Sequence, residues 1–97
     1  MKFSLQDTVR ISEDVVFREL DGEAVLLNLG SGIYFGLNDA GTRIWTLLGQ
    51  DGALRIVFEA MKQQYAVVPE RLEKDLLELV EQMHSKGLVQ ERLPTPV

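Results

Sequence analysis

The sequence predicts an α+β domain in which a three-stranded antiparallel sheet is followed by three helices. The spacing of apolar residues changes from every second residue to helical spacing at Asn38, so strands precede this point and helices follow it. The pair Asp21-Gly22 lies between two apolar runs, which is a strong signal for a two-residue hairpin. The length of 97 residues suits a single domain with one modest core.

The first strands follow from turn chemistry. The segment 15–20, VVFREL, is strand-like, and the Asp21-Gly22 turn should pair it antiparallel with a second strand at 23–29. Gly30-Ser31-Gly32 is a second turn, because glycine reaches positive φ without a steric penalty. It leads into a third strand at 33–37, IYFGL, which is a candidate for an edge of the sheet.

The first helix should run from about 39 to 48. Asn38 can cap it by accepting a hydrogen bond from a free backbone N–H at its start. Gly41 is unfavourable inside a helix by about 1 kcal/mol relative to alanine, so it indicates either a late helix start or a close backbone contact. Trp45 should help anchor this helix to the core, together with Ile44 and Leu48.

Two more helices are expected, at about 53–65 and 69–86. Pro69 suits the first helical position, whereas Val68, the implied N-cap, has no side-chain oxygen. Gly87 should end the last helix, after which Leu88-Val89 could dock as a short return strand.

The ends of the chain should lie outside the main domain, which we place at residues 15–90. Residues 1–14 are expected as an N-terminal lead-in, with 1–7 loose and a weakly alternating edge strand at 8–11. Residues 91–97 are expected as a disordered tail, because Pro94 and Pro96 lie within it.

Composition argues against several classes of function. The net charge of −5 disfavours a nucleic-acid partner, since phosphates favour a basic surface. The absence of cysteine excludes disulfides, thiolate zinc sites and thiolate-bound iron–sulfur clusters. Neither a signal peptide nor a run long enough to span a membrane is evident, so we expect a cytoplasmic protein with no membrane partner.

Catalytic constellations are missing as well. His84 is the only histidine, so no histidine pair can form, and it is interpreted as a surface or half-buried side chain. Gly30-Ser31-Gly32 lacks the ending of a phosphate loop and leads into a strand. We therefore expect no catalytic residue, no cofactor and no metal site.

The third helix has an apolar face that is wider on one side. Leucines and a methionine form a narrow stripe at Leu72, Leu76, Leu79 and Met83. One flank adds Leu77, Val80 and His84, interleaved with Glu73, whereas the other holds Asp75, Gln82 and Lys86. The wide flank either packs under the second helix or forms a groove wall for a partner chain.

Three runs carry a resemblance to a known family: VLLNLGSGIYFGLNDAGTRIW, LRIVFEAMKQQY and DLLELVEQMHSKGLV. Together they resemble the PqqD-like proteins, which are also called RiPP recognition elements and are named for a pyrroloquinoline quinone biosynthesis protein. The sequence around SGIYFGLNDAGTRIW is closer to the stand-alone members associated with lasso-peptide-type pathways than to PqqD itself. The resemblance covers about 15–89, and Val68 departs from the capping serine or aspartate that is usual there.

This resemblance implies a small winged helix-turn-helix-like domain that binds peptides. Family members bind the leader of a ribosomally made precursor peptide and present it to a modifying enzyme, often a radical SAM enzyme or a leader peptidase. The leader joins the sheet as a strand beside the third strand, in a cleft lined by the third helix. By position, the implied site residues are Ile33, Tyr34, Phe35, Gly36 and Leu37 on the strand, and Glu73, Leu77, Val80 and His84 on the helix.

Two other functions compete with peptide binding. A winged helix-turn-helix fold is typical of DNA-binding regulators, but the third helix has more acidic than basic residues, which disfavours phosphate contacts. A dimerisation or structural subunit could use the same edge strand for self-association. We expect a monomer or a weak homodimer.

Overall fold

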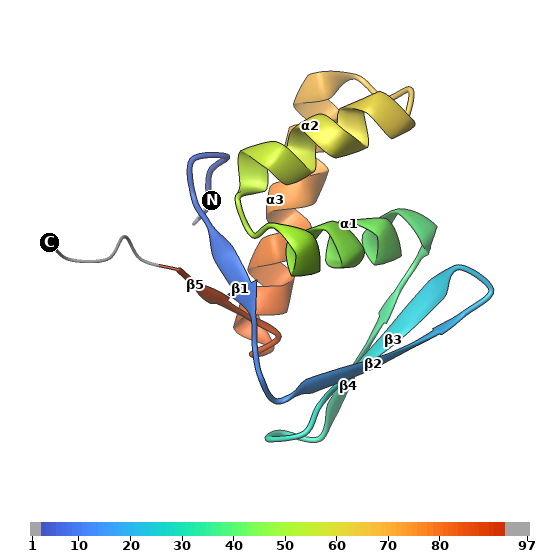
Figure 1. The fold of residues 1–97 in the computed structure, drawn as a ribbon, viewed down its shortest axis with the longest axis vertical. Coiled ribbons are helices and arrows are strands. Elements are labelled where there is room, and N and C mark those ends of the chain that lie inside the picture. The colour runs from blue at the N-terminus through green and yellow to red at the C-terminus, as the bar shows by residue number, and fades with distance from the viewer. Residues whose placement is uncertain (1–2, 93–97) are drawn as a thin grey trace, which may run out of the picture.

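The computed structural model describes residues 3–92 and contains a three-stranded sheet followed by three helices (Figure 1). The sheet has the order β2-β3-β4, and a separate two-stranded sheet pairs β1 with β5. This arrangement confirms the α+β prediction, and the boundaries of its sheet and helices lie within about two residues of those predicted. The elements are β1 (Val9–Ile11), β2 (Val15–Leu20), β3 (Glu23–Asn28), β4 (Ile33–Leu37), α1 (Asp39–Gln50), α2 (Leu54–Gln64), α3 (Pro69–Ser85) and β5 (Val89–Glu91).

The turn between β2 and β3 has the geometry that its two residues predict. Asp21 has a φ of 54° and Gly22 a φ of 82°, so both lie in the positive region that a type I′ turn requires. The turn sets an antiparallel register in which Leu20 faces Glu23 and Phe17 faces Leu26.

The turn between β3 and β4 is organised by Asn28. Its side-chain Oδ1 accepts hydrogen bonds from the backbone N–H groups of Gly30 at 2.9 Å and Ser31 at 3.3 Å. Gly32 completes the turn with a φ of 74° and donates its N–H to the Asn28 carbonyl oxygen at 2.7 Å. Because this turn closes tightly, β4 returns antiparallel beside β3.

The start of α1 explains its unusual glycine. The Asn38 side chain accepts a hydrogen bond from the Gly41 N–H at 2.8 Å, which is the expected N-cap interaction. Gly41 is buried, and a Cβ there would lie 3.2 Å from Leu37 Cδ2. The close contact, and not a late helix start, is therefore the reason for the glycine. The Thr42 hydroxyl accepts from the Ala24 N–H at 2.8 Å and ties this helix to β3.

Helix α3 begins and ends as its sequence indicates. Val68 makes no side-chain cap, and Pro69 occupies the first turn. At the other end Gly87 has a φ of 72°, and the Leu88 N–H donates to the Met83 carbonyl oxygen at 2.9 Å. This is a Schellman-type ending, which reverses the chain into β5.

The core lies where the helices meet the inner face of the sheet. Trp45 is 3% exposed, as predicted, and lies among buried aliphatic side chains. Leu26 and Ala24 bring the sheet into this core from the same face of β3. The buried hydrophobic residues come from every helix and from both ends of the described chain.

The N-terminal lead-in differs from its prediction. Phe3 and Leu5 are buried, and the Phe3 ring meets the His84 ring edge-on with a centroid distance of 5.3 Å. The looseness predicted for 1–7 is therefore wrong from Phe3 onward, because these side chains cover apolar surface that segments distant in sequence leave open.

Both short strands predicted at the ends of the domain are present. The edge strand expected at 8–11 is β1, and it pairs with β5 in a register that sets Ile11 opposite Val89. The prediction of a disordered tail from residue 91 is wrong at its first two residues. Glu91 belongs to β5, and the Arg92 N–H donates to the Thr8 carbonyl oxygen at 2.8 Å. The remainder of that tail from residue 93, and residues 1–2 of the lead-in, lie outside the described residues.

Candidate functional site

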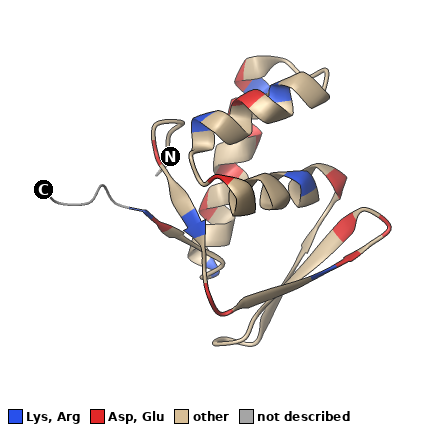
Figure 2. Cartoon of the chain, in the orientation of Figure 1, with Lys and Arg blue, Asp and Glu red and all other residues tan. Residues whose placement is uncertain are grey.

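Strand β4 lies at one edge of the three-stranded sheet, as the sequence suggested. Its outer row of backbone N–H and C=O groups has no neighbouring strand among residues 3–92. None of its five residues is charged, so β4 is tan in Figure 2. An uncharged edge strand is open to pairing with another extended chain.

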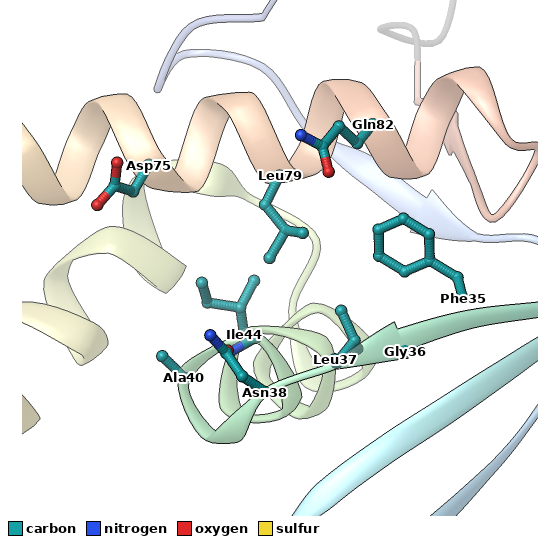
Figure 3. Close-up of a pocket in the computed structure, with 10 residues that line it drawn as sticks. Phe35, Gly36, Leu37, Asn38, Ala40, Ile44, Asp75, Leu79 and Gln82 are labelled. Carbon is teal, nitrogen blue, oxygen red and sulfur yellow. The ribbon is translucent and has the colours of Figure 1, made fainter.

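A cavity of about 360 Å³ lies beside this edge, between β4, the start of α1 and one flank of α3 (Figure 3). Side chains from all three elements point toward it. Its lining comprises Phe35, Gly36 and Leu37 of β4, Asn38, Ala40, Gly41 and Ile44 at the α1 end, and Asp75, Leu79 and Gln82 of α3. We call this cavity, together with the edge of β4, the β4–α3 groove.

The groove has an apolar floor and polar sides. Leu37 and Ile44 are buried beneath it, and Leu79 is half-buried opposite them. Asp75 and Gln82 place polar groups along the helix side. Such a lining suits one or two apolar side chains of a ligand whose backbone stays near polar groups.

A cation lies next to the Phe35 end of the groove. Lys86 Nζ is 5.9 Å from the centre of the Phe35 ring, within the range of a cation–π contact. At the other end, Asp75 Oδ2 is 3.8 Å from Arg71 Nε, in an exposed pair one helical turn apart. One end of the groove therefore has an exposed acid–base pair, and the other end has a lysine.

The structure divides the five predicted strand residues between two faces. Phe35 and Leu37 point into the groove, and Gly36 lines it through its backbone. Tyr34 is 69% exposed and lies opposite Leu27 on the other face of the sheet, because successive side chains of a strand alternate. Ile33 is exposed at the start of the strand and is absent from the lining.

The four predicted helix residues do not lie at the groove. Val80 is fully buried and Leu77 is 6% exposed, so both are core side chains, as the first of the two interpretations held. His84 packs against Phe3, and Glu73 is exposed away from the lining. The prediction that the wide flank of α3 forms the groove wall is therefore corrected, because that flank faces the interior of the domain.

The α3 residues that line the cavity were not among the predicted site residues: they are Asp75, Leu79 and Gln82. Helical spacing placed Asp75 and Gln82 on one flank and Leu79 in the stripe beside it. No local signal indicated which flank faces β4, because this depends on how α3 crosses the sheet.

Residues 3–92 contain no group of three or more histidine, cysteine, aspartate or glutamate side chains that could hold a metal ion. In the same part of the chain, no helix combines the length and apolar character needed to cross a membrane.

The fold and its groove can now be compared with known proteins. The family model described as coenzyme PQQ synthesis protein D (PqqD) matches residues 23–89, more than half of the chain. The chain belongs to the PqqD family. The matched segment runs from the start of β3 to the first residue of β5 and therefore includes every residue that lines the groove.

Two solved structures resemble this PqqD-family chain along most of its length. One is TbiB1 in complex with the TbiA(beta) leader peptide, with a TM-score of 0.81 and 34% identity over 88% of this chain and 99% of that chain. The other is lasso peptide synthetase B1 complexed with the leader peptide, with a TM-score of 0.75 and 26% identity over 90% of this chain and 99% of that one. No curated protein sequence matches the chain.

Proposed function

We propose that this PqqD-family chain binds the leader of a ribosomally made precursor peptide in the β4–α3 groove and presents it to a modifying enzyme, such as a radical SAM protein or a leader peptidase. The observation that carries the proposal is the free edge of β4 beside a cavity with an apolar floor.

Strand addition explains how such a groove holds a peptide. An extended peptide beside β4 satisfies the outer backbone groups of the strand, and this pairing demands little of the peptide sequence. Alternate side chains of the peptide then face α3, where Leu79 and Ile44 offer apolar surface. Backbone pairing supplies affinity, and the cavity supplies selection among sequences.

The comparisons support this proposal over DNA binding. Both similar solved structures are complexes with a leader peptide. A recognition helix for DNA requires a basic surface, whereas α3 has five acidic and two basic residues: Glu70, Glu73, Asp75, Glu78 and Glu81 against Arg71 and Lys74. The mixture of red and blue along α3 in Figure 2 contains no basic stripe.

An adaptor role follows from the same features. The groove offers backbone pairing and apolar contacts, so the chemistry belongs to the enzyme that receives the bound peptide. Because a ribosomally made precursor is present where it is synthesised, this role places the chain in the cytoplasm.

The direct test is to titrate the full chain with the TbiA(beta) leader peptide while following its amide chemical shifts. We expect saturable perturbations at 33–37 and at 75–86, because these segments border the groove. Perturbations centred on β2, the other edge of the sheet, would instead assign the peptide to that strand. An absence of binding would overturn the proposal if the leader encoded beside this gene also failed to bind.

A matched pair of variants separates binding from folding. Leu79→Asp places a charge in the groove and should weaken binding at least tenfold, because the carboxylate loses water when the peptide docks. Ile56→Asp makes the same change on α2, where the side chain is already 52% exposed, and should leave binding within about twofold. Equal losses in both variants would show that Leu79 does not contact the peptide.

Size-exclusion chromatography at several concentrations tests the competing role in self-association.

A further inference from the structure

One stripe of α3 follows the whole length of the β4–α3 groove. The stripe comprises Asp75, Leu79 and Gln82 of α3 and Lys86 at its C-cap. Their spacing of four, three and four residues aligns them along one side of the helix. Figure 3 shows Leu79 pointing from α3 toward Ile44 and Leu37, with Asp75 before it and Gln82 after it along the helix. Lys86 continues the stripe to the Phe35 ring, 5.9 Å from its Nζ.

The stripe is slightly longer than the part of an added strand that can face it. From Asp75 to Lys86, the C-cap of the helix, the rise is about 16 Å at 1.5 Å per residue. Positions i to i+4 of an extended peptide span about 13 Å, at 3.3 Å per residue, and the flexible Lys86 side chain can reach the last of them. Because strand side chains alternate, peptide positions i, i+2 and i+4 face α3 together.

The charges at the two ends of the stripe are opposite and accessible. Asp75 is exposed, and its pair with Arg71 is a surface contact that a second cation can share. Asp39, an acid at the start of α1, lies beside Gly22 of the β2–β3 turn. At the far end, Lys86 Nζ lies 5.9 Å from the centre of the Phe35 ring, and Gln82 between the two ends is neutral.

We propose that the groove selects its peptide by charge order: a basic residue beside Asp75, an apolar residue over Leu79 two positions along, and an acidic residue beside Lys86 two positions further. This inference rests on the proposed function and specifies the class of peptide that the site accepts. For a peptide that keeps one direction along β4, reversing the order of the charges should weaken binding.

The charge preference should be modest because the charges are exposed. Each contact joins a solvated charge on the protein to a charge on the peptide, and water screens such pairs. Two of them together should favour the matching order by about threefold to tenfold. Because the charges are exposed, the preference should shrink as salt rises, whereas the affinity from backbone pairing should persist.

The test uses synthetic versions of the TbiA(beta) leader peptide. The three peptide positions that face α3 are located by nuclear Overhauser contacts between the bound peptide and the Leu79 methyl groups. They are replaced by Lys, Leu and Glu in one version and by Glu, Leu and Lys in the other. We expect the unmodified chain to bind one version threefold to tenfold more tightly in low salt. The double variant Asp75→Lys with Lys86→Glu preserves net charge and should prefer the other version by a similar factor.

A control exchange on the same helix tests whether the preference depends on the charges at the groove. Lys74→Glu with Glu81→Lys also preserves net charge but alters positions outside the lining, so the original preference should remain. Binding of both versions with equal affinity, or a preference that Asp75→Lys with Lys86→Glu does not reverse, would overturn the charge-order inference and leave the proposed function standing. Failure of both versions to bind when the unmodified leader binds would overturn the charge-order inference. Failure of the unmodified leader and of the leader encoded beside this gene would overturn the proposed function as well.

Discussion

The side-chain amide of Asn28 donates a hydrogen bond to the backbone carbonyl oxygen of Lys86, with Nδ2 3.1 Å from that oxygen. The contact joins the β3–β4 turn to the end of α3, although the two residues are far apart in the chain. A Cβ on Gly87 would approach the same Nδ2 to 2.8 Å, so a glycine is needed there for space as well as for its positive φ. Asn28 therefore sets the separation of β4 and α3 at the Phe35 end of the groove.

Asn28→Ala should lower the free energy of unfolding by about 1–3 kcal/mol, because it leaves turn N–H groups and the end of α3 without partners. Ser31→Ala is the matched control. It removes only an exposed contact from the Ile33 N–H to the Ser31 hydroxyl, and should change the same free energy by less than about 0.5 kcal/mol. Urea denaturation of both variants makes the comparison, and equal effects would show that Asn28 does not secure this junction.

Gly22→Ala and Gly36→Ala should differ although both glycines belong to the hairpin sheet. Gly22 has a φ of 82°, so alanine there should cost about 1–2 kcal/mol. Gly36 has open space around the position of a Cβ and no positive φ, so alanine should be neutral or stabilising by up to about 1 kcal/mol. Thermal unfolding midpoints test the order, and a lower midpoint for Gly36→Ala than for Gly22→Ala would contradict it.

Gly52→Ala should disrupt the contact between the α1–α2 connection and β1. A Cβ on Gly52 would overlap the Val9 carbonyl oxygen, so the backbone must move and the hydrogen bond from the Val9 N–H to the Gly52 oxygen, 2.9 Å long, is lost or distorted. We expect a loss of at least about 2 kcal/mol in stability, in the range of severe core changes. Gly49→Ala, where the nearest atom is Ile11 Cδ1 at 3.5 Å, should be tolerated and gain up to about 1 kcal/mol of helix propensity. Chemical denaturation of the two variants should give opposite signs.

Leu77→Ala and Leu79→Ala should separate the two flanks of α3. Leu77 is a core side chain, so its truncation should cost about 2–5 kcal/mol in unfolding free energy. Leu79 is only half-buried, so Leu79→Ala should lower the unfolding free energy by less. The same change should weaken peptide binding. Denaturation combined with peptide titration measures both effects. A folded, stable Leu77→Ala chain that no longer binds peptide would restore the wide flank as the groove wall.

Local sequence rules accounted for most of the fold. The Asp21-Gly22 turn, the Asn38 cap and the Gly87 ending each depend on the conformation of a few adjacent residues, so their residue types were sufficient to predict them. The candidate edge strand was recognisable for a similar reason, since hydrophobic alternation and turn residues define a strand without reference to its neighbours.

The tertiary structure decided which surfaces meet. Phe3 and Leu5 are buried through contacts with residues distant in sequence, and no periodicity in their short segment signals this. Helical spacing divided α3 into two flanks but was equally compatible with either facing β4. That choice depends on long-range packing: the wide flank with Leu77 and Val80 removes more apolar surface from water when it faces the core, which leaves Asp75, Leu79 and Gln82 beside the free edge of β4.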